Sequence, residues 1–288
     1  PASGLPGIKK AVCDRVKADF HVEYAPSQVM VAAGAKHCVY VALRALVNPG
    51  DEVIVPAPYW VSYIELVRMM GGVPVVVTAE ESAGFKITAQ QLRDAITPKT
   101  KAMILNNPSN PTGMVYNGEE LKALVDVCVE NDLYIIADEI YSCLLYDGLK
   151  FTSVASLGEE VKKRTILING VSKAYAMTGW RIGYALAEPE IIKVMSNYLS
   201  HCAGSCCTIS QKAAEAALSG SQEKIETMRQ AFEERRNYLV ERMNQVEGVS
   251  CIKPEGAFYV MMNIEKLVGR TVHGQVVNTC DHFSQAFL

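Results

Sequence analysis

The sequence predicts an α/β protein of three layers, α/β/α, in which helices cover both faces of a mixed, mostly parallel seven-stranded sheet. Seven short runs rich in Val, Ile and Ala are predicted as strands, and amphipathic helical patterns lie between most of them. Continuous apolar strands that alternate with helices are typical of a sheet that is buried on both faces. With 288 residues and 49% hydrophobic composition, the chain can also bury a large core.

The predicted strands and helices alternate along most of the chain. Helices are predicted at 35–47, 60–70, 88–95 and 118–130. The last two strands are joined by too few residues for a helical crossover, so we expect the final strand to run antiparallel to its neighbours. The predicted strands are VMVAAG (29–34), EVIVPA (52–57), VPVVVT (73–78), KAMILN (101–106), YIIADEI (134–140), RTILIN (164–169) and IGYALA (182–187).

The C-terminal part of the chain has a different pattern, which predicts a domain boundary near Gly220. We expect residues 1–220 to form a large domain and residues 221–288 to form a connecting helix and an incomplete small α+β domain. A long charged helix is predicted over 221–246, and VSCIKPEGAFYVMMNI (249–264) alternates like a strand of the smaller unit. Because the chain begins abruptly and ends inside an amphipathic helical pattern, we expect a segment of a longer protein.

Composition and charge exclude several kinds of partner. The formal net charge of -3 gives no basic surface for nucleic acid or an anionic membrane. No apolar run approaches the roughly 18 residues of a transmembrane helix, and the first residues lack a signal-peptide layout. We therefore expect a cytoplasmic protein that binds small molecules and other copies of itself.

The nine cysteines are scattered through apolar segments, as is typical of small buried residues in a reducing compartment. Cys202, Cys206 and Cys207 lie close together in the sequence but form no CxxC pair. No metal site is therefore expected.

Residues that directly follow the predicted strands can meet at one edge of the sheet, where open α/β sheets bind ligands. After the first strand, Gly34 permits a tight turn, and the backbone N–H groups of Ala35 and Lys36 open a helix. Such a helix N-terminus can hold an anion, although a glycine before a helix is also common as a simple turn. The stretch lacks the GxGxxG spacing of dinucleotide folds, which argues against a nicotinamide enzyme.

Two more strand ends carry residues suited to a ligand. Trp60 follows the second strand at a turn, where it either packs under a loop or faces a ligand. The fourth strand leads into NNPSNPTG, whose prolines and glycine fix the backbone. This rigid loop presents three side-chain amides, those of Asn106, Asn107 and Asn110.

Charged residues follow the fifth and sixth strands. Asp138 follows three apolar residues, and an unpaired buried carboxylate would cost several kcal/mol, so either a cationic partner or a helix N-cap is implied. Ser172 and Lys173 follow the sixth strand, and Arg181 lies eight residues beyond Lys173. We call Gly34 and the backbone N–H groups of Ala35 and Lys36 the anion cradle. A lysine, an acid, an arginine and this cradle at one sheet edge indicate a site for a phosphorylated ring with a carbonyl group.

The segments NNPSNPTG, ADEIY and SKAYAMTGWRIGY, in that order and at those intervals, resemble the fold-type I pyridoxal-phosphate aminotransferases of classes I and II. PYWVSYIELV and PEGAFYVMMNI narrow the resemblance to the bacterial and archaeal aspartate aminotransferase branch. The resemblance runs from Pro1 to about Ile264.

The resemblance implies pyridoxal 5'-phosphate as the cofactor and assigns a role to each residue around its ring. Lys173 would form the Schiff base and act as general base. Asp138 would pair with the protonated pyridine nitrogen, and this nitrogen is the cation that a buried carboxylate requires. Tyr141 and Asn110 would hydrogen-bond the ring hydroxyl, and Trp60 would stack on the ring.

The resemblance also implies how the phosphate would be bound. Arg181 would hold it with a planar, bidentate guanidinium group. The backbone N–H groups of Ala35 and Lys36, which follow Gly34, would donate hydrogen bonds to it, and Ser172 would be a further contact.

Transamination is the activity that the resemblance implies: an amino group passes from an L-amino acid to a 2-oxo acid in a ping-pong cycle. Lys36 either meets the distal acid of a dicarboxylate, which favours aspartate and 2-oxoglutarate, or is an exposed helix lysine. Aromatic, alanine-type or prephenate substrates stay open. Two other functions also stay open, namely a pyridoxal-phosphate-sensing regulator with a DNA-binding domain before Pro1, and a β-lyase on the same scaffold. The family implies a homodimer, and its substrate-carboxylate arginine and its cross-subunit tyrosine are expected outside residues 1–288.

Overall fold

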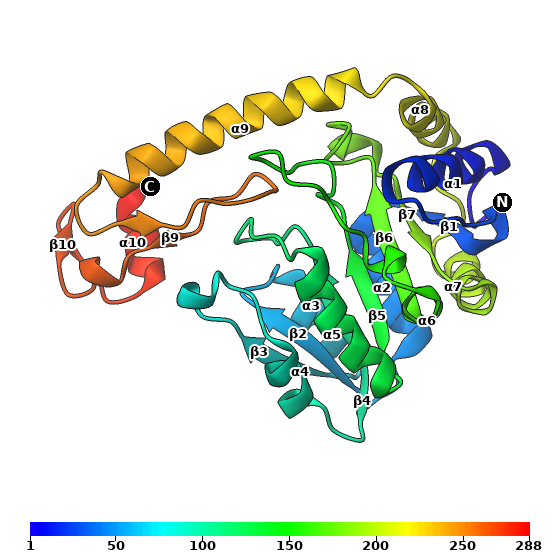
Figure 1. Ribbon diagram of the computed structural model, residues 1–288, viewed down its shortest axis with the longest axis horizontal. Helices are drawn as coiled ribbons and strands as arrows, with labels where there is room; N and C mark the ends of the chain where they lie inside the picture. The colour runs from blue at the N-terminus through cyan, green and yellow to red at the C-terminus, as the bar shows by residue number, and fades with distance from the viewer.

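A mixed seven-stranded sheet forms the centre of the protein (Figure 1). The computed structural model describes residues 1–288, apart from the side chain of Phe287. The strand order is β1-β7-β6-β5-β4-β2-β3, and β7 runs antiparallel to both of its neighbours while the other pairs are parallel. The predicted sheet and its antiparallel last strand are confirmed. The strands are β1 (Val29–Ala32), β2 (Glu52–Ala57), β3 (Val73–Thr78), β4 (Thr100–Asn106), β5 (Tyr134–Asp138), β6 (Thr165–Gly170) and β7 (Gly183–Leu186).

Helices cover both faces of this sheet, as the continuous apolar strands predict. In β4, Ala102 and Ile104 face the helices α2, α3 and α7, while Met103 and Leu105 face α4 and α5. Helices α1 and α8 continue the second layer over β1 and β7. The helices of this part are α1 (Pro6–Phe20), α2 (Ala35–Leu46), α3 (Ser62–Met69), α4 (Ala89–Ala95), α5 (Gly118–Glu130), α6 (Glu159–Arg164), α7 (Pro189–Cys202) and α8 (Thr208–Ser219).

Local capping explains where two of these helices begin. The hydroxyl of Thr88 accepts a hydrogen bond from the Gln91 N–H at 3.2 Å, and the Gln91 side chain accepts one from the Thr88 N–H at 2.9 Å. Asn117 and Glu120 form the same reciprocal pair at the start of α5. These capping boxes satisfy N–H groups that have no partner within the helix, so they fix the first turn.

A separate group of elements follows the sheet. Helix α9 (Glu223–Asn244) crosses from the side of α8 to a small C-terminal unit (Figure 1). No helix among the described residues is long and apolar enough to cross a membrane. The C-terminal elements are β8 (Ser250–Cys251), β9 (Met262–Asn263), β10 (Thr271–Val272), β11 (Gln275–Val276) and α10 (Cys280–Phe287).

The prediction of one strand over 249–264 is wrong. Only its two ends pair, as β8 and β9, and the residues between them return to the edge of the large sheet. The N–H groups of Glu255 and Gly256 donate to the carbonyl oxygen of Gly113 at 2.9 and 2.7 Å, and the Ala257 N–H donates to Leu144 O at 2.9 Å. We call residues 254–259 the strap, because it joins the C-terminal unit to two loops of the large sheet.

Helix α9 is held against the strap by a buried arginine. The guanidinium group of Arg236 donates to both carboxylate oxygens of Asp147, at 2.8 and 3.0 Å, and to Pro254 O at 2.6 Å. It also lies 4.7 Å from the ring centroid of Tyr146. Because a buried guanidinium is costly without partners, these contacts fix the position of α9 relative to the sheet.

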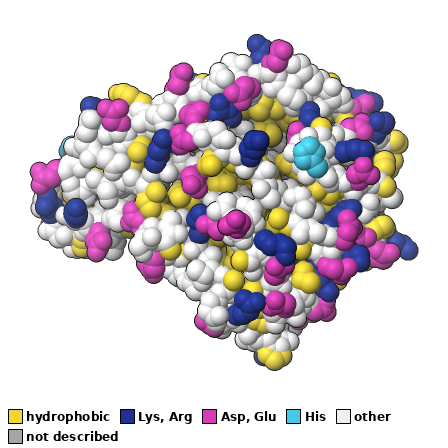
Figure 2. Space-filling view, viewed as in Figure 1, with side chains coloured by type: hydrophobic (Ala, Val, Ile, Leu, Met, Phe, Trp, Pro, Cys, Tyr) yellow, Lys and Arg dark blue, Asp and Glu magenta, His cyan; other side chains and the backbone are white. Residues whose placement is uncertain are grey.

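Charged side chains are distributed evenly over the face shown in Figure 2. Basic and acidic groups are interspersed there, with apolar side chains between them. This face therefore has the mixed charge of an ordinary protein surface, as the small net charge predicts.

Gly183 gives a direct test of the packing between β7 and the start of α2. A Cβ atom at this position would lie 2.3 Å from Ala35 N and 2.4 Å from Gly34 C, which are backbone atoms that cannot move aside cheaply. We expect Gly183→Ala to lower the free energy of unfolding by about 1–3 kcal/mol, as overpacking does. Urea denaturation measures this loss.

Gly179→Ala is the matched control, because a Cβ atom there would meet no heavy atom within 4 Å. Equal unfolding midpoints for Gly183→Ala and the parent would contradict the predicted clash.

Candidate active site

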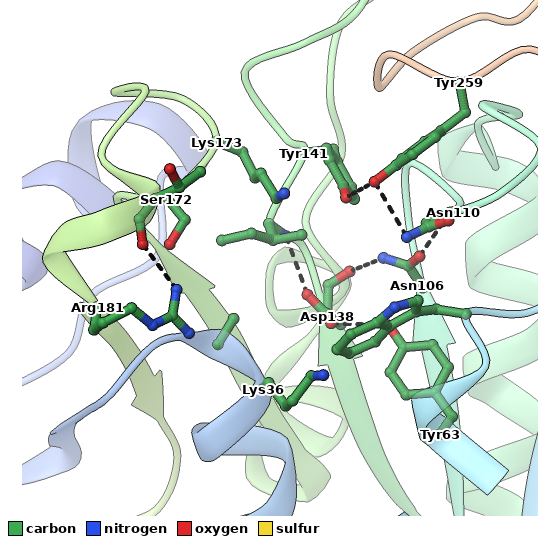
Figure 3. Close-up of a pocket in the computed structure, with 14 residues that line it drawn as sticks. Lys36, Tyr63, Asn106, Asn110, Asp138, Tyr141, Ser172, Lys173, Arg181 and Tyr259 are labelled. Atoms are coloured by element: carbon green, nitrogen blue, oxygen red, sulfur yellow. Dashed lines mark hydrogen bonds between the residues drawn. The ribbon is translucent and has the colours of Figure 1, made fainter. Parts of the chain in front are cut away.

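A pocket of about 270 Å³ lies at the carboxyl ends of β4, β5 and β6, and the N-terminus of α2 closes one side of it (Figure 3). The structure brings nine of the ten predicted site residues into its lining, and the tenth, Gly34, lies directly behind Arg181. The lining residues are Ala35, Lys36, Trp60, Tyr63, Asn106, Asn110, Asp138, Ile140, Tyr141, Ser172, Lys173, Thr178, Arg181 and Tyr259.

Lys173 points into this pocket from the turn that follows β6. Its ammonium nitrogen lies 5.8 Å from the ring centroid of Tyr141 and 5.2 Å from that of Phe258. Burial lowers the pKa of Lys173, the nearby Arg181 guanidinium lowers it further, and Asp138 opposes the shift. The amine is therefore deprotonated more readily than that of a free lysine, as a nucleophile or general base requires.

Asp138 ends the central strand β5 with its side chain only 3% exposed. One carboxylate oxygen accepts a hydrogen bond from the Tyr63 hydroxyl at 2.8 Å, and the other accepts one from the Ile140 N–H at 3.3 Å. Burial raises the pKa of Asp138 to about 6, and Tyr63, the Ile140 N–H and Lys173 oppose this shift. The carboxylate thus lacks a strong cationic partner at close range, and a positively charged ligand group would supply one.

A turn rather than a helix follows Asp138, so the N-cap alternative for this residue is wrong. The backbone of Asp138 is held instead by the side-chain amide of Asn106, which donates to Asp138 O at 2.9 Å. This contact ties the ends of β4 and β5 together below the pocket.

The anion cradle lies where the start of α2 meets Arg181. Gly34 has a φ of 92°, which favours glycine, and it precedes the first residue of α2. The Arg181 guanidinium donates to Thr178 O at 2.9 Å and to Ala33 O at 3.3 Å, which holds it beside the helix N-terminus. A Cβ atom on Gly34 would lie 2.5 Å from this guanidinium, so the missing side chain leaves room for Arg181 beside the start of α2.

Tyr141 and Asn110 meet at the other end of the pocket through a third residue, Tyr259 of the strap (Figure 3). The two tyrosine hydroxyls are 2.7 Å apart, and the Asn110 amide donates to the Tyr259 hydroxyl at 3.3 Å. Burial raises the pKa of Tyr141. Tyr141 is therefore a neutral hydrogen-bond donor at physiological pH.

Trp60 and Lys36 line the remaining wall together. The Lys36 ammonium lies 4.6 Å from the indole centroid, and the Trp60 ring meets Tyr63 edge-on at 5.4 Å. The indole is thus held between a cation and an aromatic edge, which fixes its plane.

Sequence reasoning missed Tyr63 and Tyr259 as site residues. Tyr63 had a usable signal, because it lies three positions after Trp60 in the helix predicted over 60–70, and such neighbours share a helix face. Tyr259 had none, because its place depends on the strap pairing with distant loops.

The pocket is rich in cations. Among the described residues that line it, Lys36, Lys173 and Arg181 are basic and Asp138 is the only acid. No group of three or more His, Cys, Asp or Glu side chains that could hold a metal comes together among the described residues. The arrangement suits an anionic small molecule that also carries a basic or cationic group for Asp138.

Comparisons with known proteins agree with this chemistry. The family model for aminotransferase class I and II matches residues 1–288. The aspartate aminotransferase of Geobacillus stearothermophilus is 51% identical over 91% of this chain and 67% of that protein, and that of Bacillus sp. (strain YM-2) is 46% identical over 100% and 72%. The aspartate aminotransferase structure from Rhizobium meliloti has a TM-score of 0.95 and 38% identity, and covers 98% of this chain and 71% of that one.

The chain belongs to the aminotransferase class I and II family, and it is a transaminase by that membership. The chain spans 67% to 72% of the length of these three relatives.

A second buried acid, Glu139, lies next to Asp138 but faces away from the pocket. One of its carboxylate oxygens accepts hydrogen bonds from the Ser153 hydroxyl at 3.1 Å and from the Val154 N–H at 2.8 Å. The other has no hydrogen-bond partner among the described residues. Burial raises the pKa of Glu139 to about 8.

The raised pKa of Glu139 predicts a pH-dependent stability. Between the ordinary value of 4.5 and about 8, the folded protein keeps a proton that the unfolded chain has lost. The stability contributed by this proton is complete below pH 4.5 and is lost as the pH rises toward 8, by about 1 kcal/mol per pH unit. We expect Glu139→Gln to remove this part of the slope, measured as urea midpoints of the cofactor-free protein from pH 5 to 8.

Glu234→Gln, at an exposed position of α9, is the control and should leave the slope unchanged. Ionisation of Asp138 adds a loss of stability of the same sign up to about pH 6. Glu139→Gln and Glu234→Gln both keep this loss. Parallel slopes for Glu139→Gln and the parent would show that Glu139 is ionised throughout.

Proposed function

We propose that this transaminase uses pyridoxal 5'-phosphate bound covalently through Lys173, and that it moves an amino group from L-aspartate to 2-oxoglutarate. The observation that carries this proposal is the lysine amine of lowered pKa in one pocket with the buried Asp138 carboxylate. A cofactor with an aldehyde, a basic ring nitrogen and a phosphate has a complementary group for the lysine, the acid and the cradle.

The residues present fit this cofactor. The turn at Gly34 brings the start of α2 beside the Arg181 guanidinium, and Ser172 lines the same pocket, so these groups could hold an anion together. Asp138 would hold the ring nitrogen in its protonated form. Tyr141 and Asn110 would bind the ring oxygen, and Trp60 would cover the ring face.

When bound, the cofactor supplies an electron sink that stabilises negative charge at the substrate Cα. Lys173 would act as the general base that moves the proton away from that carbon, which needs a neutral amine. Burial and the Arg181 charge both favour the neutral amine. Asp138 keeps a positive charge at the far end of the ring, because a buried carboxylate is far more stable beside a cation than alone.

The charge of the pocket supports a dicarboxylate substrate. Arg181 would be occupied by the cofactor phosphate, which leaves the Lys36 ammonium for the distal carboxylate of aspartate or 2-oxoglutarate. Lys36 lies over Trp60 at the pocket wall, where a substrate side chain can reach it. The three relatives compared above are named aspartate aminotransferases.

We also propose a cytoplasmic homodimer, following the family's shared-site architecture. Residues 1–220 would be the cofactor-binding domain, and 221–288 would be the connecting helix and part of a small domain. Sedimentation of the cofactor-loaded protein tests the dimer.

Lys173→Ala tests the function directly. We expect turnover of L-aspartate with 2-oxoglutarate to fall by at least about 10²- to 10⁴-fold, because the positioned base is lost. Cofactor binding should persist through the phosphate cradle and Asp138. Borohydride reduction followed by mass spectrometry should fix the cofactor covalently to the parent protein and not to the variant.

Lys193→Ala is the control, because this lysine is exposed on α7 outside the pocket. Near-normal turnover by Lys173→Ala would refute the function. Cofactor that binds the parent but is unchanged by L-aspartate would point to another amino donor or to a sensor.

Lys36→Met tests the substrate. The variant keeps the length of the side chain and removes its charge, so we expect the KM for L-aspartate to rise about 10-fold, as for one lost charged hydrogen bond. The KM for L-alanine, which has no distal carboxylate, should stay within about twofold by the same reasoning. Steady-state kinetics with both donors measures the difference.

Lys101→Met is a matched control, because Lys101 also lies over an aromatic ring, that of Tyr134 at 5.3 Å, but outside the pocket. An equal change in KM for both donors would show that Lys36 does not select a dicarboxylate.

A further inference from the structure

The hydroxyl of Tyr259 lies between the two residues that would bind the ring oxygen of the cofactor (Figure 3). It is 2.7 Å from the Tyr141 hydroxyl and 3.3 Å from the amide nitrogen of Asn110. Among the described residues, these two groups are its hydrogen-bond partners. Tyr259 thus has one neighbour that can only donate and one that can donate or accept.

Either of the two tyrosine hydroxyls can donate to the other, so the direction of their hydrogen bond follows from the proposed role of Tyr141. The Asn110 amide nitrogen donates, so the Tyr259 oxygen accepts there. If Tyr259 donates to Tyr141, the Tyr141 oxygen accepts the Tyr259 proton, and the Tyr141 proton is left for an acceptor in the pocket. In the opposite direction the Tyr141 proton would be bound by Tyr259, and none would be left for the ring oxygen that Tyr141 would hold.

The position of Tyr259 is fixed by the strap rather than by its own side chain. The strap pairs with Gly113 O on one side and Leu144 O on the other, in the loops that carry Asn110 and Tyr141. A Cβ atom on Gly256 would lie 2.8 Å from Leu144 O, so this close pairing requires the glycine. The backbone therefore sets the Tyr259 hydroxyl against both of its partners.

We propose that Tyr259 is a positioning residue that aims the Tyr141 hydroxyl proton into the pocket, toward the ring oxygen of bound pyridoxal phosphate. This proposal rests on the proposed function. A hydroxyl that receives a hydrogen bond is itself a stronger donor, because the two bonds polarise each other. Tyr259 would therefore strengthen the hold of Tyr141 on a negatively charged ring oxygen without touching the cofactor.

Removal of the Tyr259 hydroxyl should change how the bound cofactor titrates. With weaker donation from Tyr141, the ring oxygen keeps more negative charge and holds a neighbouring proton more tightly. In Tyr259→Phe we expect the midpoint of the pH-dependent change in cofactor absorption to rise by about 0.5–1 pH unit, as for one hydrogen bond of about 1 kcal/mol. Phenylalanine keeps the ring contacts with Tyr141 and Phe258, and urea denaturation checks the fold.

Tyr146→Phe is the matched control. The Tyr146 hydroxyl donates to Ala257 O in the same strap, but Tyr146 does not line the pocket. A purely structural effect of loosening the strap would appear in both variants, whereas the proposed effect appears only in Tyr259→Phe.

A double-mutant cycle with Tyr141→Phe shows whether Tyr259 acts through Tyr141. We expect Tyr259→Phe to cause no further shift once the Tyr141 hydroxyl is absent. An unchanged midpoint in Tyr259→Phe, an equal shift in Tyr146→Phe, or additive shifts in the double variant would each overturn the proposal. Failure of the parent to bind the cofactor would refute the proposed function before any variant is compared, and this inference with it.

Discussion

The burial of the Asp138 carboxylate is the constraint around which the pocket is built. Strand β5 lies in the middle of the sheet, between β4 and β6, and its apolar residues are covered on both faces. An acid at the end of such a strand meets little water, so its charge must be met by donors or cations. The Tyr63 hydroxyl and a backbone N–H meet it in part, and Lys173 contributes from across the pocket. The negative charge of Asp138 is thus only partly compensated within the fold, and the pocket therefore favours a ligand that carries a positively charged group.

The antiparallel strand β7 explains how Lys173 and Arg181 reach the same edge of the sheet. A helical crossover would send the chain to the opposite edge before the next strand begins. Here the chain leaves β6 at its carboxyl end, makes a short turn through η4 (Thr178–Trp180) and returns as β7 from the same edge. Both cations are therefore carried by one short connection. The close approach of β7 to the start of α2 depends on Gly183, and the missing side chain of Gly34 leaves room for the guanidinium.

The parts of the molecule that could be predicted from the sequence depend on local patterns. The apolar runs indicate the strands within two residues of their ends, because strands that are buried on both faces consist almost entirely of apolar residues. Asp138, Lys173 and the Gly34 turn could be predicted because each lies at or shortly after the end of a strand. The strap could not, since its alternating residues match a strand while Pro254 and Gly256 prevent one. Its location comes from backbone hydrogen bonds to Gly113 and Leu144, more than one hundred residues away in the sequence, and no local pattern encodes them.

The two adjacent acids, Asp138 and Glu139, show how the fold separates like groups by environment. Successive residues at the end of a strand point to opposite sides, so Asp138 faces the pocket and Glu139 faces Ser153. Burial raises the pKa of both, to about 6 and about 8, but only Asp138 has cations nearby. At neutral pH Asp138 is mainly ionised and Glu139 mainly protonated. The positive field of Lys36, Lys173 and Arg181 is therefore opposed by a single carboxylate within the pocket. The pocket keeps an excess of positive charge for an anionic ligand because Glu139 faces away from it and Asp138 is the only acid among the described residues that line it.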